Sequence, residues 1–222
     1  MSAILLDIEG TVSDKKFVTQ VLFPFARERI KAFIRTHAEE PEVANALRLM
    51  REKLGHRAAS TEDIGRALER WIDEDRKEEP LKSLQGLIWA EGYASGTLVS
   101  HIYPDVPPAL ERWKRAGKAI AIFSSGSVAA QKLFFAHTEK GDLTPFFSSY
   151  FDLSTGPKFE AASYTKIAKA LDHPPKEVRF YSDVVREIDA ALAAGMAAVL
   201  VERDGPVESS GAFRRIGDFT GE

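Results

Sequence analysis

Two carboxylates follow a short apolar run near the start of the sequence. Asp7 and Glu9 come directly after Ala3-Ile4-Leu5-Leu6, and Gly10, which permits a sharp turn, follows them. An apolar run of this length predicts a buried strand of a parallel sheet, and open α/β sheets bind ligands at the carboxyl ends of such strands. Residues two apart in an extended segment face the same way, so Asp7 and Glu9 could hold a divalent cation between them. Taken alone, the aspartate could equally cap a helix.

Polar residues also follow three later predicted strands, and they are Ser124-Ser125, Lys158 and Asp183. If the sheet is parallel, all of these strand ends lie at one edge. An aspartate there could accept a phosphoryl group, and a second carboxylate could transfer protons, while hydroxyls and a lysine could hold the phosphoryl oxygens. The serine segment also precedes a predicted helix, whose free amides favour an anion. Together these residues have the composition of a phosphoryl-transfer site.

Each member of the set also has a purely structural interpretation. Ser124–Ser127 could be a turn and helix cap, and Lys158 could be a solvated loop lysine. Asp183 could cap the helix that follows, on which Glu187 and Asp189 are expected to form the first turn and the solvated face. The occurrence of all these residue types at successive strand ends favours the site over the separate structural interpretations.

The elements that must position these residues alternate along most of the chain. The predicted strands are 3–6, 118–123, 150–153, 178–181 and 197–201, and the predicted helices between them are 106–117, 128–135, 161–171 and a helix from after Asp183 to Gly195. This order predicts an α/β fold with a Rossmann-like doubly wound parallel sheet. The tail after Asp204 is rich in Gly and Ser and yields no predicted element.

The segment from Phe17 to Gly96 contains no strand pattern. Apolar residues at spacings of three and four predict helices over 17–37, from Pro41, from Ser60-Thr61-Glu62-Asp63 and from Pro80 to Gly92, and Pro24 could kink or divide the first of them. We therefore expect a helical domain over residues 16–99, inserted after the first strand, and a core domain of residues 1–15 and 100–222.

Composition excludes several classes of function. The chain of 222 residues has 30 basic and 33 acidic residues and no basic block, so nucleic acid is not an expected partner. It has no cysteine, so a metal must bind oxygen or histidine, and oxygen ligands favour Mg²⁺. His101 and His137 have no second ligand at metal-like spacing. Because no leader or membrane span is apparent, we expect a cytoplasmic protein that makes no membrane contact, and we expect a monomer.

These motifs resemble those of the haloacid dehalogenase-like superfamily over the whole chain. Its phosphatases have an Asp-x-Asp motif, a Ser or Thr strand end, a Lys and a late acidic motif in that order. Within the superfamily the sequence looks most like the enolase-phosphatases of methionine salvage, the acireductone synthases. This likeness is carried by Asp7-Ile8-Glu9-Gly10-Thr11, Val21-Leu22-Phe23-Pro24-Phe25-Ala26, Gln85-Gly86-Leu87-Ile88-Trp89, Ser124-Ser125-Gly126-Ser127-Val128 and Ser182-Asp183-Val184-Val185. Glu9 departs from the superfamily pattern but is the rule in this subfamily.

The resemblance implies a role for each candidate residue. Asp7 would be the nucleophile, with Glu9 and Lys158 as further catalytic residues. Asp7, Glu9 and Asp183 would bind Mg²⁺, whereas Ser124, Ser125 and Lys158 would hold the substrate phosphate. The substrate would be 2,3-diketo-5-methylthiopentyl-1-phosphate, which is enolised and then dephosphorylated to the acireductone. The helical segment would be a cap that closes over the site and excludes water.

Three alternatives remain open at the level of sequence. A generalist sugar-phosphate or nucleotide phosphatase needs the same core without the enolase step. A non-catalytic phosphate-binding domain would have the fold without turnover, but the presence of every expected carboxylate together with Lys158 argues against it. A dehalogenase is the weakest candidate, because those enzymes need no metal and the clustering of Glu9 and Asp183 around Asp7 would be unexplained.

Overall fold

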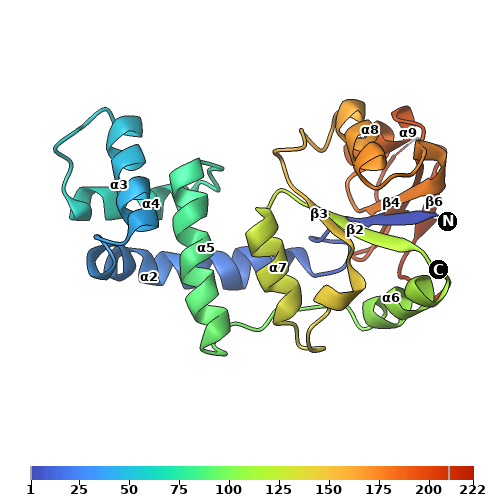
Figure 1. Cartoon of the computed structure of the whole chain (residues 1–222), viewed down its shortest axis with the longest axis horizontal. Helices are drawn as coiled ribbons and strands as arrows, with labels where there is room; N and C mark the ends of the chain where they lie inside the picture. Colours follow the sequence, from blue (N-terminus) through green and yellow to red (C-terminus); the bar gives the residue numbers. More distant parts are fainter. Residues whose placement is uncertain (1, 210) are drawn as a thin grey trace. The chain divides into compact units, whose positions relative to one another are not determined.

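A computed structural model describes residues 2–209 and 211–222, so that Met1 and Ser210 lie outside the described residues (Figure 1). The chain divides into two compact units. One consists of the residues up to Lys15 together with those from Val99 onward, and the other consists of Lys16–Leu98. A separate hydrophobic cluster fills each unit.

A parallel sheet forms the centre of the first unit, with the strand order β3-β2-β1-β4-β5-β6 in the described part of the chain. The strands are β1 (Ala3–Leu6), β2 (Ala119–Phe123), β3 (Ser149–Phe151), β4 (Val178–Ser182), β5 (Ala197–Val201) and β6 (Arg214–Ile216). This confirms the predicted doubly wound α/β fold. The sequence of the tail predicted no element, and the structure adds β6 there, a short strand with two arginines that lacks an apolar run.

Strand β1 occupies the middle of the sheet, between β2 and β4. Its last residue, Leu6, is level with Ile122 on one side and with Tyr181 on the other. The backbone amide of Asp7 continues the ladder by donating to the Tyr181 carbonyl at 3.0 Å. This register carries the chain out of β1, β2 and β4 at nearly the same level, which is why the polar residues that follow these strands share one edge.

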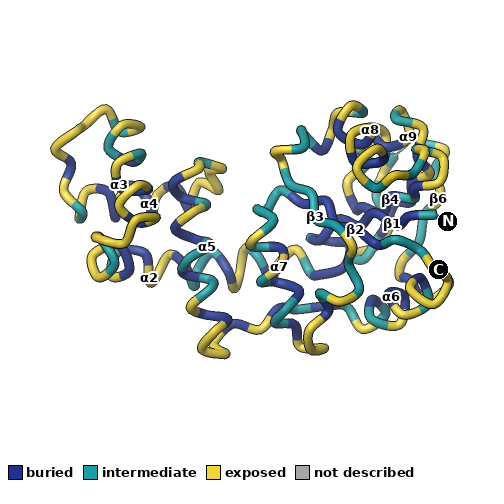
Figure 2. The backbone as a smooth tube through the Cα atoms, viewed as in Figure 1, coloured by how far each residue is buried: buried dark blue, intermediate teal, exposed yellow. Residues whose placement is uncertain are grey.

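Helices cover both faces of this sheet (Figure 1). Helices α8 (Ala161–Ala170) and α9 (Val185–Ala193) pack on the face that carries Leu5, Phe123 and Phe180. Helices α6 (Val106–Arg115) and α7 (Val128–Ala136) cover the opposite face, where Trp113 contacts Tyr181 and Phe135 contacts Tyr150. Because both faces are covered, β1 is buried along its whole length (Figure 2).

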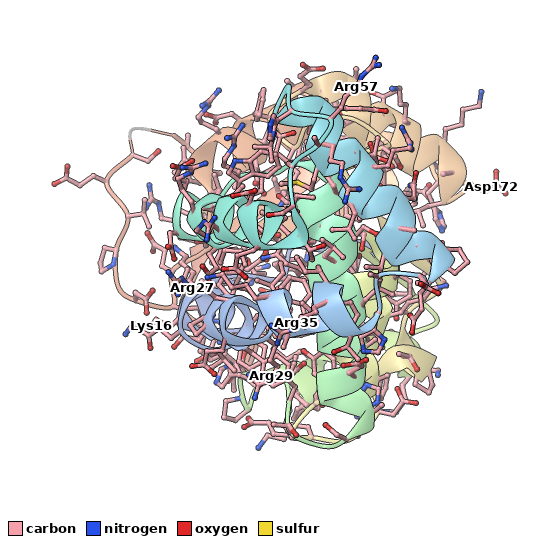
Figure 3. All side chains as sticks on the ribbon, turned by 90° about the vertical axis from the view of Figure 1, so that its left-hand side faces the viewer. Lys16, Arg27, Arg29, Arg35, Arg57 and Asp172 are labelled. Carbon is pink, nitrogen blue, oxygen red and sulfur yellow. The ribbon has the colours of Figure 1, made fainter. Side chains whose placement is uncertain are left out.

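The second unit is helical and consists mainly of α2 (Phe23–Thr36), α3 (Pro41–Lys53), α4 (Thr61–Asp73) and α5 (Glu79–Ala94). The predicted start of α4 is confirmed by a capping box, in which Ser60 Oγ accepts from the Asp63 amide at 3.1 Å and Asp63 Oδ2 accepts from the Ser60 amide at 3.2 Å. On α2, which carries Arg27, Arg29 and Arg35 (Figure 3), the Arg27 guanidinium makes two hydrogen bonds to Asp73 at the end of α4.

The helix predicted over residues 17–37 is divided into two α-helices with a π-helical turn between them. A short α1 (Lys15–Phe17) passes into a π-helical turn, η1 (Val18–Leu22), before α2 begins. Pro24 has no amide hydrogen and its ring crowds the preceding turn, so the wider turn falls just before it. The Trp89 indole donates to the Leu22 carbonyl at 2.9 Å. Trp89 is therefore a structural residue, as its position on an apolar helical face predicts.

None of the helices in residues 2–209 and 211–222 combines the length and the apolar character needed to cross a lipid bilayer.

Candidate active site

Asp7 lies at the end of β1 with only 3% of its side chain exposed. Its Oδ1 accepts a hydrogen bond from the Ile8 amide at 2.8 Å and another from Lys158 Nζ at 2.5 Å. The two residues that the sequence places at the ends of different strands thus make direct contact. The carboxylate is held in one orientation by a backbone donor and a cation.

Lys158 is buried, with 8% of its side chain exposed, so it is not a solvated loop lysine. Besides Asp7 Oδ1, its Nζ lies 2.8 Å from Glu187 Oε2. Burial lowers the pKa of Lys158, but the two carboxylates outweigh that effect and the pKa is raised. The Tyr164 hydroxyl donates to the Lys158 carbonyl at 2.6 Å and fixes the backbone at this point. The ammonium is therefore charged and positioned beside Asp7.

Glu187 was predicted to belong to the solvated first turn of its helix, and this prediction was wrong. Only 12% of its side chain is exposed, and it faces Lys158 from the first turn of α9. The Ser182 hydroxyl lies 2.8 Å from Glu187 Oε2 and 3.2 Å from Asp7 Oδ2, so it bridges the two carboxylates. Burial raises the pKa of Glu187 to about 7, with the charge of Asp7 acting in the same direction and Lys158 opposing it. Asp189, by contrast, is exposed as predicted.

Asp183 follows β4 and is also buried, with 6% of its side chain exposed. Its carboxylate pairs with the Lys15 ammonium through Oδ2. Burial raises the pKa of Asp183, the hydrogen bond from Lys15 opposes this shift, and the negative charge of Asp7 adds to it. The structure therefore brings Asp7 and Asp183 close enough to repel each other, and each has a lysine as counter-ion.

The segment after Asp7 forms a tight turn that contains Glu9. The Gly10 amide donates to the Ser13 carbonyl at 2.7 Å, and the amides of Val12 and Ser13 both donate to the Ile8 carbonyl. Gly10 has a φ of +72°, and a Cβ at this position would stand 2.5 Å from Asp183 Oδ2. Only glycine fits here, because both the backbone conformation and the neighbouring carboxylate exclude a side chain.

Arg203 holds the same turn from the far end of β5. Its side chain, 6% exposed, donates to the Thr11 carbonyl from Nε at 3.0 Å and from Nη2 at 2.9 Å. Its Nη1 donates to Asp105 Oδ1 at 2.8 Å, and Asp105 Oδ2 accepts from the Phe219 amide. The sequence did not predict this role, since Arg203 lies between the last predicted strand and the Gly- and Ser-rich tail.

Ser124 and Ser125 leave β2 at the edge that also carries Asp7. The Ser124 amide donates to the Phe151 carbonyl at 3.1 Å, and its hydroxyl accepts from the Gly126 amide at 3.2 Å. The buried Gln131 side chain of α7 clamps this loop, because its amide nitrogen donates to the carbonyls of Gly126 and Phe151 at 2.8 and 2.9 Å. The serines and Glu9 thus share the edge with Asp7 through the strand register.

Within residues 2–209 and 211–222, no three His, Asp or Glu side chains converge as a ready-made metal cluster. The carboxylates of Asp7 and Asp183 instead form ion pairs with the ammonium groups of Lys158 and Lys15, respectively. His101 accepts a hydrogen bond from the Asp14 amide at 3.1 Å and His137 contacts the Leu133 carbonyl, so both histidines have structural contacts.

A doubly wound parallel sheet that presents a buried, lysine-paired aspartate beside a serine loop and a late acidic pair defines a haloacid dehalogenase-like hydrolase. The sequence matches that hydrolase family over residues 1–195. Enolase-phosphatase E1 of Azotobacter vinelandii is 51% identical over 91% of this chain and 89% of its own length. Enolase-phosphatase E1 of Sorangium cellulosum is also 51% identical, over 91% of this chain and 88% of its own. Within the haloacid dehalogenase-like hydrolases, the chain belongs to the enolase-phosphatase E1 family.

Solved structures share the fold of this chain. The UTR4 protein of Saccharomyces cerevisiae superposes with a TM-score of 0.85 at 31% identity, covering 100% of this chain and 99% of that one. A phosphatase of the same superfamily from Thermococcus onnurineus, at 20% identity and a TM-score of 0.65, shares the fold. The chain is thus a phosphatase that acts on a phosphorylated small molecule, in a class of hydrolases that generally depends on a metal ion.

Proposed function

We propose that the protein is the bifunctional enolase-phosphatase of methionine salvage, which converts 2,3-diketo-5-methylthiopentyl-1-phosphate to the dephosphorylated acireductone. The observation that carries the phosphatase step is the 2.5 Å contact between Asp7 Oδ1 and Lys158 Nζ at the carboxyl edge of the sheet. The enolase step rests on the two relatives that are 51% identical and are named enolase-phosphatase E1. The choice of substrate rests on the resemblance of the sequence motifs to those of the methionine-salvage enolase-phosphatases.

In the phosphatase step Asp7 is the nucleophile. A carboxylate oxygen attacks phosphorus, the bond between phosphorus and the substrate oxygen breaks, and the leaving oxygen takes up a proton as the product departs. Water then attacks the phosphorus of the aspartyl phosphate, which releases inorganic phosphate and restores the carboxylate. Lys158 stabilises the added negative charge, and Ser124 and Ser125 bind phosphoryl oxygens at the N-terminus of α7.

Mg²⁺ is the cofactor that best suits this site, with Asp7, Glu9 and Asp183 as its ligands. The donors are all oxygen, and the buried Asp183 carboxylate already attracts a cation in the form of the Lys15 ammonium. The metal would supply positive charge against the phosphoryl oxygens.

The helical unit, Lys16–Leu98, is proposed to act as the cap that excludes water during catalysis. It has its own core, built around Ile30, Leu68 and Leu84, so it can move as a body. We further propose that its apolar residues contact the methylthio end of the substrate.

The test is turnover of the diketone phosphate with Mg²⁺, followed in parallel by ultraviolet absorbance of the enol and by release of phosphate. A panel of sugar phosphates and nucleotides serves as the comparison. We expect the diketone phosphate to be preferred, with enol absorbance rising before phosphate. Faster turnover of a sugar phosphate or nucleotide, with no enol signal, would instead make the protein a generalist phosphatase.

A further inference from the structure

Lys15 makes an unusual ion pair where the first unit ends. It is the last residue of this unit before the helical segment and the first residue of α1, and its ammonium contacts Asp183 Oδ2. The partners differ greatly in exposure, since 55% of the lysine side chain is exposed but only 6% of the aspartate side chain. A largely exposed lysine side chain thus contacts a buried carboxylate.

Asp183 needs this cation because of its surroundings. It is buried beside the negatively charged Asp7, and the ammonium of Lys158 is engaged by Asp7 and Glu187. In the described part of the chain, Lys15 is the cation that the structure places on Asp183. A buried carboxylate next to a like charge is unfavourable unless a positive charge compensates it.

The path of the lysine side chain depends on Gly10. The Lys15 Cε fills the place where a Cβ of residue 10 would stand, and the Asp183 carboxyl carbon lies 2.6 Å from that same position. The absence of a side chain at Gly10 therefore lets the methylene stem of Lys15 cross the turn and bring the ammonium to Asp183. The contact between Lys15 and Asp183 therefore requires glycine at position 10.

We propose that Lys15 is a displaceable internal counter-cation, which occupies Asp183 when the metal site is empty and leaves when a divalent cation binds. This inference rests on the metal site of the proposed function. A divalent cation bound to the Asp183 carboxylate would repel the Lys15 ammonium held on the same group, so we expect the lysine to leave. The long, half-exposed lysine can swing into water, whereas Asp183 is held at the end of β4.

Two consequences follow from this competition. The metal must displace Lys15, so Lys15 weakens the apparent metal affinity. In the metal-free protein the lysine compensates the Asp183 charge, so removing it should lower stability until metal is added.

The experiment titrates metal-free protein with Mg²⁺ alone in a calorimeter and records thermal unfolding with and without Mg²⁺. The variants are Lys15→Met and Lys15→Gln, which remove the charge, and Lys15→Arg, which keeps it. Lys16→Met is the matched control, because it removes the same charge one residue further on, from an exposed side chain (Figure 3). Asp183→Asn, which lacks the proposed ligand charge, reports on the metal site itself.

We expect Lys15→Met and Lys15→Gln to bind Mg²⁺ about tenfold more tightly than the parent, with Lys15→Arg and Lys16→Met within about twofold of it. Both neutral variants should unfold at lower temperature than the parent without metal and recover with Mg²⁺. Equal or weaker Mg²⁺ binding by both neutral variants, or unchanged metal-free stability, would overturn the role of Lys15 while leaving the metal site intact. If the parent and Asp183→Asn bind Mg²⁺ equally or not at all, the metal site itself fails and the inference with it.

Discussion

Glu187 Oε2 lies 2.8 Å from the same Lys158 ammonium that contacts Asp7 at 2.5 Å, so one buried cation is shared by two carboxylates. The trio carries a net negative charge when all three groups are ionised. Burial of the Glu187 carboxylate, reinforced by the negative charge of Asp7, raises its pKa to about 7.

The raised pKa predicts a pH dependence of stability for the metal-free protein. Because the folded-state pKa of Glu187 lies above its ordinary value of 4.5, the folded state binds the proton more tightly than the unfolded state does. The contribution of Glu187 to the free energy of unfolding is fully present below pH 4.5 and is lost as the pH rises through about 7. We expect Glu187→Gln to unfold at higher temperature than the parent at pH 8, by roughly 5 °C, with the difference shrinking toward about pH 5. Thermal unfolding across this range checks it, and a constant difference would contradict it.

Asp7→Asn should separate the two chemical steps. An amide cannot attack phosphorus, so phosphate release should fall by at least about three orders of magnitude, while the amide oxygen can still accept a hydrogen bond from Lys158 and the protein stays folded. We expect slow accumulation of a phosphorylated enol in this variant, detected by ultraviolet absorbance alongside a phosphate assay. Appreciable phosphate release by the purified variant would mean that Asp7 is not the nucleophile.

Gly10→Ala should damage both the backbone and the carboxylate beside it. The φ of +72° alone is expected to lower the stability of the alanine variant by about 1 kcal/mol, and the clash of the new Cβ with Lys15 and Asp183 adds to that loss. Gly55→Ala is the matched control, because Gly55 has a φ of +65° and a Cβ added there would meet nothing within 4 Å. Denaturant unfolding of both variants measures the difference. Similar losses of stability in the two variants would show that the side chains next to Gly10 move aside at no measurable cost.

Arg203→Met should destabilise the protein by about 3 kcal/mol, because it leaves the largely buried Asp105 carboxylate without its cation and frees the Thr11 carbonyl. The double variant Arg203→Met with Asp105→Asn should recover part of this loss. Denaturant unfolding of the single and double variants completes the cycle. Purely additive losses would show that the pair is not coupled.

Much of the core was predictable because apolar runs that end in polar residues mark buried parallel strands. The ends of β1 and β2 coincide with Leu6 and Phe123, where the apolar pattern stops, and β4 continues one residue past Tyr181, to Ser182. Their meeting at one edge follows from the βαβ order. The placement of Asp7 and Lys158 at the same edge was predicted in this way.

Glu187, Lys15 and Arg203 were not predicted as parts of the site, because a charged residue outside an apolar run is typically solvated. The spacing of Asp183 and Glu187 is one helical turn, which could have indicated that both acids approach the same region. Nothing in the pattern around Lys15 or Arg203 distinguishes them from surface residues. Their roles depend on contacts made only in the folded chain: Lys15 contacts the Asp183 carboxylate, and Arg203 donates to a carbonyl of the turn after Asp7.

The central position of β1 also constrains synthesis of the protein. Ala3 pairs with Ala119 and with Val178, so β1 is made long before either neighbour exists. The helical unit, Lys16–Leu98, has a hydrophobic core of its own and can fold on the ribosome in the meantime. Until β4 emerges, one edge of the apolar strand that bears Asp7 has no partner and is open to pairing with another nascent chain. Translation arrest or truncation before Val178 would therefore yield an aggregation-prone fragment that also lacks Asp183 and Glu187.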